Sequence, residues 1–226
     1  MRRREALAIG EIYHVCNKTI AGYKIFNYAQ DYFRMKQMLL YYRLASTPGQ
    51  FSNFLKLCKI KKDGFFEHLE ALREDNADVV QIIAYCVMPT HIHLAMKQLQ
   101  EGGITKFMRN LLNSYSRYFN IKTKRNGPLW VGRFKSVRVK SDEQLLHLTR
   151  YIHLNPVTAS LVRNPEDWEA SSYGEYISTD RNELRVCDFE NILDILPERY
   201  ASFVKDGTGY QKDRARIKHL MLDEDP

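Results

Sequence analysis

The stretch Met88-Pro89-Thr90-His91-Ile92-His93-Leu94-Ala95-Met96 decides how the rest of the chain is interpreted. Residues 79–87 before it are rich in β-branched and aromatic side chains. This composition predicts a buried strand over 79–87 and a second strand after the Met-Pro-Thr turn. Because successive side chains of a strand point to opposite faces, His91 and His93 share one face. Two imidazoles on a rigid strand are half of a metal site, although so short a pattern also occurs on half-exposed sheet faces.

The composition favours one domain with an anionic partner. The chain has 226 residues, a formal charge of +7, a pI near 9.1 and 12% aromatic residues. A basic, aromatic-rich chain suits a polyanion, nucleic acid first, although a merely basic soluble protein has the same composition. The four cysteines form no C-x-x-C pair, and no apolar run is long enough to span a membrane. We therefore expect a protein of the cytosol, associated with the nucleoid and not with a membrane.

The first half of the chain predicts a strand, a helix and an insertion. Residues 11–17 alternate as in a strand, and 28–44 carry apolar residues at helical spacing up to a Ser-Thr-Pro-Gly cluster. The segment at about 47–75 is basic and aromatic, with a short helix expected over 65–72. It could touch DNA, but a solvated excursion with a small core of its own is the favoured interpretation.

A long amphipathic helix is expected to begin at Gly102-Gly103. The apolar residues recur at i, i+3, i+4, i+7, i+8 and i+11 and form one stripe. Tyr115 lies on this stripe, so we expect it to be a core residue and not a catalytic one. The stripe consists of Ile104, Phe107, Met108, Leu111, Leu112 and Tyr115.

A basic turn over 122–130 and a strand over 131–140 follow. Cationic side chains here are suited to phosphates, and the Trp130 and Phe134 rings to base stacking. An edge strand protected by lysines would have the same sequence. The expected DNA contacts are Lys124, Arg125, Trp130, Arg133, Lys135 and Arg138.

The next helix carries a second row of polar residues. Ser141 and Gln144 form a capping box at its start, and Pro156 is expected to close it. Leu145, Leu148 and Ile152 make the buried stripe. His147, Tyr151 and Asn155 recur at i, i+4 and i+8 beside that stripe. The helix therefore offers a phenol and an amide at the edge of its packed face, although most helical tyrosines at such an edge are structural.

Several motifs occur in order along residues 10 to 177. They are Tyr-His-Val at 13–15, Cys-Val-Met-Pro-x-His-Ile-His-Leu at 86–94, Gly-Pro-Leu-Trp-Val-Gly-Arg-Phe-Lys-Ser at 127–136, Arg-Tyr-Ile-His-Leu-Asn-Pro-Val at 150–157, and Asp-Trp-Glu-Ala-Ser-Ser-Tyr at 167–173. Each motif is weak alone, but together they are specific. In this combination the chain resembles the single-tyrosine HUH transposases of the insertion-sequence type, and most closely their REP-associated tyrosine transposase branch.

The resemblance implies an α+β fold with a ferredoxin-like antiparallel sheet and helices packed on it. We expect a transposase domain over 1–177 with the basic insertion at about 47–75, and a C-terminal helical extension over 178–226, which lies outside the resemblance. By position, His91 and His93 match the metal-binding histidines, Tyr151 the nucleophile, and Asn155 the residue proposed to complete the metal site. Thr90 departs from the usual Asn or Asp, and residues 17–18 from an Arg-Gly that bears on DNA contacts near the first strand.

The implied chemistry is cleavage of single-stranded or hairpin DNA with Mg²⁺ or Mn²⁺. Tyrosine is a poor nucleophile because its pKa is near 10, so the phosphate must be activated by a metal ion. Attack by Tyr151 would give a 5′-phosphotyrosyl intermediate, and transposition would then need two active sites, as in a homodimer, or a release step. One alternative is a domesticated regulator that binds DNA hairpins without cutting. Another is a metal-dependent hydrolase with a water nucleophile.

Overall fold

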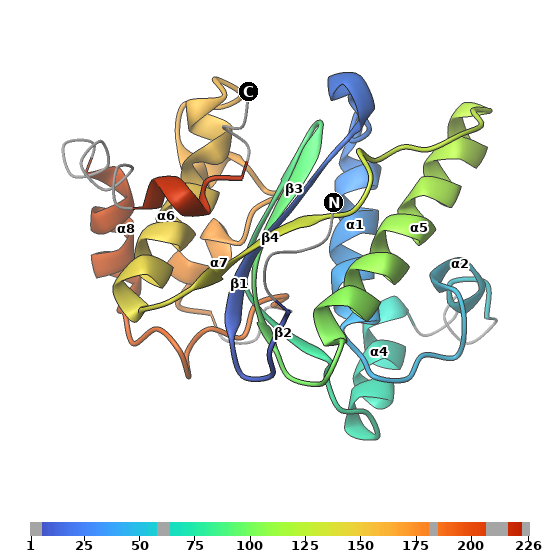
Figure 1. The fold of residues 1–226 in the computed structure, drawn as a ribbon, viewed down its shortest axis with the longest axis horizontal. Helices are drawn as coiled ribbons and strands as arrows, with labels where there is room; N and C mark the ends of the chain where they lie inside the picture. The colour runs from blue at the N-terminus through green and yellow to red at the C-terminus, as the bar shows by residue number, and fades with distance from the viewer. Residues whose placement is uncertain (1–5, 58–63, 181–184, 207–216, 223–226) are drawn as a thin grey trace.

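The computed structural model describes residues 6–57, 64–180, 185–206 and 217–222, and it contains a four-stranded antiparallel sheet. The strand order is β2-β3-β1-β4, with β1 paired to both β3 and β4. This order and the alternation of strands with helices give the ferredoxin-like arrangement, as predicted (Figure 1). The elements are β1 (Ile12–Lys18), α1 (Ala29–Tyr42), β2 (Val80–Met88), β3 (His91–Gln98), α5 (Gly103–Thr123) and β4 (Lys135–Val139).

Helices cover both faces of the sheet. The long helices α1 and α5 lie on one face, and α6 (Asp142–Thr158), α7 (Tyr173–Ile177) and α8 (Pro197–Lys205) lie on the other (Figure 1). The remaining short helices are α2 (Phe51–Phe54), α4 (Phe65–Glu74), η1 (Ile20–Gly22), η2 (Pro165–Asp167) and η3 (Lys218–Leu220). The sheet is thus enclosed on both sides, which explains why residues 79–87 lack the apolar–polar alternation of a half-exposed strand.

The apolar stripe of α5 packs on the sheet as predicted. All six of its residues are buried, and Tyr115 is fully enclosed, with its hydroxyl donating to Ile25 O at 2.9 Å. The first turn of α5 approaches the start of β2 so closely that a Cβ on Gly103 would lie 2.2 Å from Val79 O. A glycine is therefore required where α5 starts. Tyr115 is a core residue, as its place on the stripe predicted.

The insertion contributes aromatic side chains to the core on α1. Phe51, Phe54 and Phe65 are buried, and the rings of Phe51 and Phe54 lie 5.5 and 4.8 Å from the ring of Tyr41. Because these residues belong to the same core cluster as the sheet, the described part of the insertion does not have a separate core. The expected short helix is present as α4, and residues 58–63 lie outside the described part.

Two predictions about element boundaries were wrong. The strand expected over 131–140 begins only at Lys135, because the chain turns at Gly132, whose φ of +63° is left-handed. Pro156 does not end α6, which continues to Thr158. A proline this close to a helix end removes only one hydrogen bond. Backbone bonds from Ala159 N to Asn155 O and from Leu161 N to Pro156 O, both 2.9 Å, complete the turn.

A buried arginine at the C-terminal end of α1 links residues 186–188 to the segment before β2. Arg43 donates to Asp78 at 2.6 Å, to Val186 O at 3.2 Å and to Asp188.

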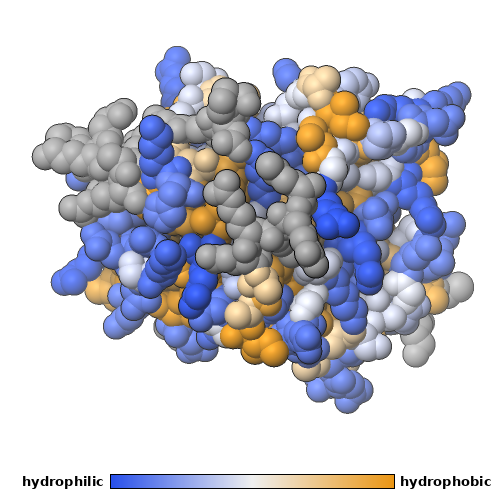
Figure 2. Space-filling model, in the orientation of Figure 1, coloured by the Kyte–Doolittle hydropathy of each residue, from blue (hydrophilic) through white to orange (hydrophobic). Residues whose placement is uncertain are grey.

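The surface of the view in Figure 2 is mainly hydrophilic, with hydrophobic atoms in small separate groups. Among the described residues, no helix is both long and apolar enough to cross a membrane.

Candidate active site

Three histidines meet on the face of the sheet that α6 covers. His93 pairs in register with Cys16 of β1, and His91 with Lys18, so both imidazoles lie at the end of the sheet where β3 begins. Their ring centroids are 4.8 Å apart and the ring planes are perpendicular. His14 of β1 joins them, with its Nε2 3.0 Å from Nδ1 of His93. The shared face predicted for His91 and His93 is confirmed.

His14 was not singled out in the sequence, although it stands in the Tyr-His-Val motif. It is fully buried, its Nδ1 is hydrogen-bonded to Leu220 O, and its ring stacks on His93 with centroids 5.2 Å apart. Strand parity puts His14 on one face of β1, but only the β1–β3 register shows that this is the face of His93. The signal was therefore present but could not be used without the register.

The helix α6 brings the tyrosine to this cluster. Ser141 caps it by accepting from Gln144 N at 3.2 Å, while the Gln144 side chain accepts from Lys140 N at 2.9 Å. Tyr151 is 4% exposed, and its ring meets His93 edge-on at 5.8 Å and His14 at 6.0 Å between centroids. The fold thus brings together a phenol and imidazoles that are 58 or more residues apart along the chain.

Asn155 lies one turn beyond Tyr151 on the same helix. Its side chain is 8% exposed, and its amide nitrogen donates weakly to Tyr151 O at 3.4 Å. The Leu145, Leu148 and Ile152 stripe is buried beside it, as predicted. The resemblance suggested the amide oxygen of Asn155 as a metal ligand, and this role remains a prediction.

The imidazoles have the environment of neutral metal ligands. His14 engages Nδ1 of His93, and Thr90 Oγ1 lies 2.9 Å from Nδ1 of His91, so Nε2 is in each case the nitrogen suited to coordination. Burial, reinforced by the charges of His91, His14 and Lys18, holds the pKa of His93 well below its usual value. No group of three His, Cys, Asp or Glu residues within the described ranges is arranged to hold a metal, so a third ligand would have to be an amide or water. The donor set fits a divalent ion with open positions.

Most of the predicted DNA contacts lie near this end of the sheet, but Arg138 pairs in register with Tyr13 towards the opposite end of β1. Trp130 and Phe134 are each only 8% exposed, and the Trp130 indole donates to Leu112 O at 3.2 Å. Their rings are packed against protein and do not offer a face to a base. The exposed or half-buried cations are Lys124, Arg125, Arg133, Lys135 and Arg138.

Some of these cations already have partners. Arg138 forms an ion pair with Glu11 at 2.5 Å, and Arg125 donates to Pro128 O at 2.8 Å. The segment that carries most of them, residues 124–134, runs from the end of α5 to β4 across the end of the sheet at which β3 begins (Figure 1). The basic segment is therefore near the histidine end and not at the opposite end of the sheet.

Known proteins resemble part of this chain in sequence. A family model described as "Transposase IS200 like" matches residues 60–155. A Haemophilus influenzae protein assigned as a REP-associated tyrosine transposase is 31% identical over 104 residues, which cover 41% of this chain and 58% of that protein. The chain thus spans little more than half the length of this relative. The family model spans both His91 and His93, and both comparisons are with transposases, a class of enzymes.

Two solved structures are distant likenesses. A REP-associated tyrosine transposase bound to a REP hairpin has a TM-score of 0.49 and 15% identity, covering 83% of this chain and 97% of that one. A Deinococcus radiodurans protein assigned as a transposase has a TM-score of 0.35 and 14% identity, covering 67% and 95%. The fold assignment rests on the strand order and register of this chain itself. The resemblance carried by the sequence motifs, to the IS200-type transposases and their REP-associated tyrosine branch, is confirmed by the family model and by the curated relative.

Proposed function

We propose that the protein is a metal-dependent single-strand DNA endonuclease and strand transferase that acts at hairpin or repeat DNA. The observation that carries the proposal is the packing of Tyr151 against His93, with ring centroids 5.8 Å apart. A nucleophile and paired imidazoles in one buried cluster are the parts that phosphodiester transfer needs. The relatives' names, which describe transposases, support the same activity.

His91, His93 and Asn155 would hold the metal. A bound Mg²⁺ or Mn²⁺ would serve as a Lewis acid that activates and orients the scissile phosphate. A nitrogen-rich site suits Mn²⁺ at least as well as Mg²⁺, which prefers oxygen ligands. His14 is a positioning residue in this scheme, because its hydrogen bond to Nδ1 fixes the ring of His93.

Tyr151 would be the nucleophile. Its hydroxyl oxygen forms a bond to phosphorus as it loses its proton to solvent, and the bond from phosphorus to the 3′ oxygen breaks. The products are a 5′-phosphotyrosyl DNA and a strand with a free 3′-hydroxyl, which takes up a proton. Because the phosphodiester energy is retained in the covalent bond, a 3′-hydroxyl can later rejoin the strands without ATP. Lys124, Arg125, Arg133, Lys135 and Arg138 would neutralise backbone phosphates.

The test uses purified protein with end-labelled single-stranded hairpin DNA whose flanks are a random-sequence pool. With Mn²⁺ we expect a protein–DNA adduct on a denaturing gel, and none with EDTA. Tyr151→Phe should abolish the adduct but not DNA binding. The double variant His91→Ala, His93→Ala should do the same, because these residues hold metal and not the DNA backbone.

The outcomes separate the alternatives. Free DNA ends without an adduct would indicate a hydrolase in which Tyr151 is structural. Binding without any cleavage would indicate the domesticated, non-cleaving regulator of hairpin repeats. Undiminished cleavage by the His91→Ala, His93→Ala variant would overturn the metal assignment.

A further inference from the structure

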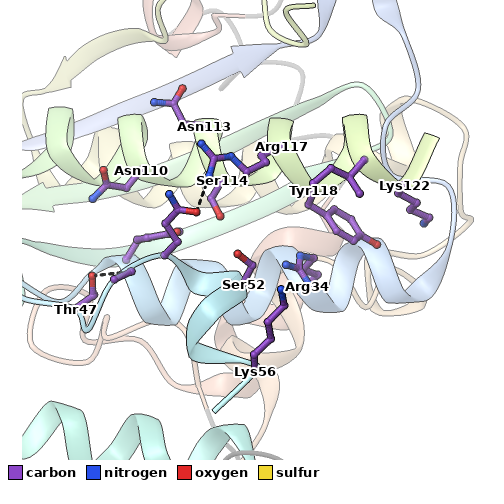
Figure 3. Close-up of a pocket in the computed structure, with 14 residues that line it drawn as sticks. Arg34, Thr47, Ser52, Lys56, Asn110, Asn113, Ser114, Arg117, Tyr118 and Lys122 are labelled. Atoms are coloured by element: carbon purple, nitrogen blue, oxygen red, sulfur yellow. Dashed lines mark hydrogen bonds between the residues drawn. The ribbon is translucent and has the colours of Figure 1, made fainter. Parts of the chain in front are cut away.

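A cavity lined by several cations lies on the face of the sheet opposite to Tyr151. It has a volume of about 660 Å³ and is enclosed by α1, by the segment that includes α2, and by α5. Figure 3 shows Arg34, Ser52 and Lys56 gathered below Arg117 and Tyr118 of α5. We call this cavity the α1–α5 pocket. Because α6 and the histidines are on the other face, the pocket is not part of the candidate active site (Figure 1).

The charge of the α1–α5 pocket is positive. Its lining includes Arg34, Lys56, Arg117 and Lys122, together with amide and hydroxyl side chains such as Asn113. Among the described residues that line it, none is a carboxylate. A concave site with several cations, polar donors and no acidic lining residue is suited to an anion with several oxygen acceptors.

Arg34 gives the strongest indication of an anionic ligand. Its guanidinium lies over the rings of Tyr118 and Phe51, 4.2 and 5.1 Å from their centroids, and its Nε is buried without a hydrogen-bond partner in the described part of the chain. Burial lowers the pKa of Arg34, and only tyrosines act against this effect. A half-buried cation that is held by aromatic faces and has no carboxylate partner among the described residues is costly unless an anion binds.

The buried Arg43 provides the contrast within the same chain. Its guanidinium is paired with Asp78 and Asp188, and these carboxylates raise its pKa despite burial. The charge of Arg43 is therefore neutralised by two carboxylates of the same chain. Within the described ranges Arg34 has no carboxylate partner, because Asp31, one turn earlier on α1, is engaged by Lys122 at 2.5 Å and by the Tyr118 hydroxyl at 2.9 Å.

Arg117 and Lys56 have no carboxylate partner among the described residues. Arg117 donates to the neutral amide of Gln50 at 2.7 Å, which fixes the side chain but leaves its charge uncompensated. Lys56 is exposed and lies beside Arg34 and Ser52 in Figure 3. Of the four lining cations, Lys122 is the one paired with a carboxylate of the described part of the chain, Asp31. Arg34, Lys56 and Arg117 are thus the charges available to a ligand.

We propose that the α1–α5 pocket binds the phosphodiester backbone of a DNA segment outside the cleaved one. The inference rests on the proposed function for the identity of the polyanion. The pocket extends to Lys122 near the C-terminal end of α5, and the chain continues from there into the basic segment 124–134 at the histidine end of the sheet. DNA held at Tyr151 can follow these cations around the end of the sheet to the α1–α5 pocket. The pocket is large enough for more than a single phosphate group.

The experiment measures DNA binding by fluorescence anisotropy as a function of salt. All proteins carry Tyr151→Phe and EDTA is present, so that binding is measured whether or not the wild-type protein forms an adduct. Pocket variants are Lys56→Gln with Arg117→Gln, and separately Arg34→Met, which keeps an apolar stem between the two rings. Arg109→Gln is the matched control, because Arg109 is an exposed cation of α5 outside the pocket.

For a long hairpin with flanking strands, the slope of log K against log[salt] should fall by about one for each cation removed. Arg109→Gln should leave that slope close to the parent's. For a short single strand confined to the cleavage site, the pocket variants should bind like the parent, because the strand cannot reach the far face. An equal effect of Arg109→Gln, or an equal effect on short and long DNA, would overturn the proposal.

A titration with pyrophosphate distinguishes a small-anion site. If the pocket variants lose pyrophosphate binding but keep the parent's affinity and salt slope for long DNA, the pocket takes a small anion and the DNA proposal is wrong. If the pocket variants bind long DNA more weakly than the parent does, and pyrophosphate competes with long DNA only in proteins with an intact pocket, the assignment to backbone phosphates is supported. Failure of the proposed cleavage would appear in the adduct assay and not here.

Discussion

Replacing Tyr115 by Phe tests whether this residue is purely structural. The tyrosine ring packs on Phe26 at 4.7 Å and on Trp130 at 6.3 Å between centroids, and phenylalanine keeps both contacts. What is lost is the hydrogen bond from the hydroxyl to Ile25 O at 2.9 Å, in a site with no exposed surface. The carbonyl of Ile25 would then be buried without this donor.

The expected cost follows from that geometry. A neutral hydrogen bond contributes about 0.5 to 1.5 kcal/mol net, and an acceptor left unsatisfied adds to the loss. We therefore expect Tyr115→Phe to lower the free energy of unfolding by about 1 to 2 kcal/mol. For a chain of this length, this corresponds to a fall in Tm of about 2 to 8 °C.

Urea denaturation and thermal unfolding measure the loss, and the adduct assay well below Tm measures activity. Tyr115→Phe should form the adduct at the parent's level, whereas Tyr151→Phe should fold normally and form none. A folded Tyr115→Phe protein that makes no adduct, beside a Tyr151→Phe protein that does, would mean that the two tyrosines have been assigned the wrong way round. An unchanged Tm would refute the estimate for the buried hydroxyl.

Three further predictions concern stability and binding. Gly103→Ala should cost about 1 to 3 kcal/mol in urea denaturation, because its Cβ would meet Val79 O at 2.2 Å, and a fully stable variant would contradict the close approach. Burial lowers the pKa of His153 from 6.5 to about 3, so the unfolded chain binds the proton more readily. Its contribution to stability is complete above pH 6.5 and falls by about 1.4 kcal/mol per unit as the pH drops towards 3, and His153→Gln should flatten this part of the stability curve. Arg133→Gln and Lys135→Gln should each reduce the salt slope of hairpin binding by about one, while equal binding to any duplex with little response to salt would contradict the proposed contacts.

Local patterns in the sequence predicted the main elements and the core. The i, i+3, i+4 stripe of α5 placed Tyr115 inside, and strand parity placed His91 and His93 on one face, because both depend only on backbone periodicity. The end of α6 was missed because the rule for the residue before proline is a preference, and Asn155 is helical despite it. The rings of Trp130 and Phe134 could not be placed, because aromatic residues serve cores and nucleic-acid surfaces equally well.

Features that combine distant segments could not be predicted. The hydrogen bond between His14 and His93 depends on the β1–β3 register, which spans 79 residues. The α1–α5 pocket depends on how Arg34, Lys56 and Arg117 converge from three segments, and no motif marks them. In both cases the residue types were visible in the sequence, and their proximity was not.

The short connection between β4 and α6 affects how the proposed reaction would depend on concentration. Only Lys140 and Ser141 separate the two elements, and Tyr151 of the same chain already contacts His93. A chain with its own tyrosine beside its own histidines does not need to meet a second copy to make the first cut. Adduct formation with saturating DNA should therefore be first order in protein, and an inactive Tyr151→Phe chain added in excess should not slow it. Joining one DNA end to another is a different matter, since each chain can hold only one 5′ end at a time.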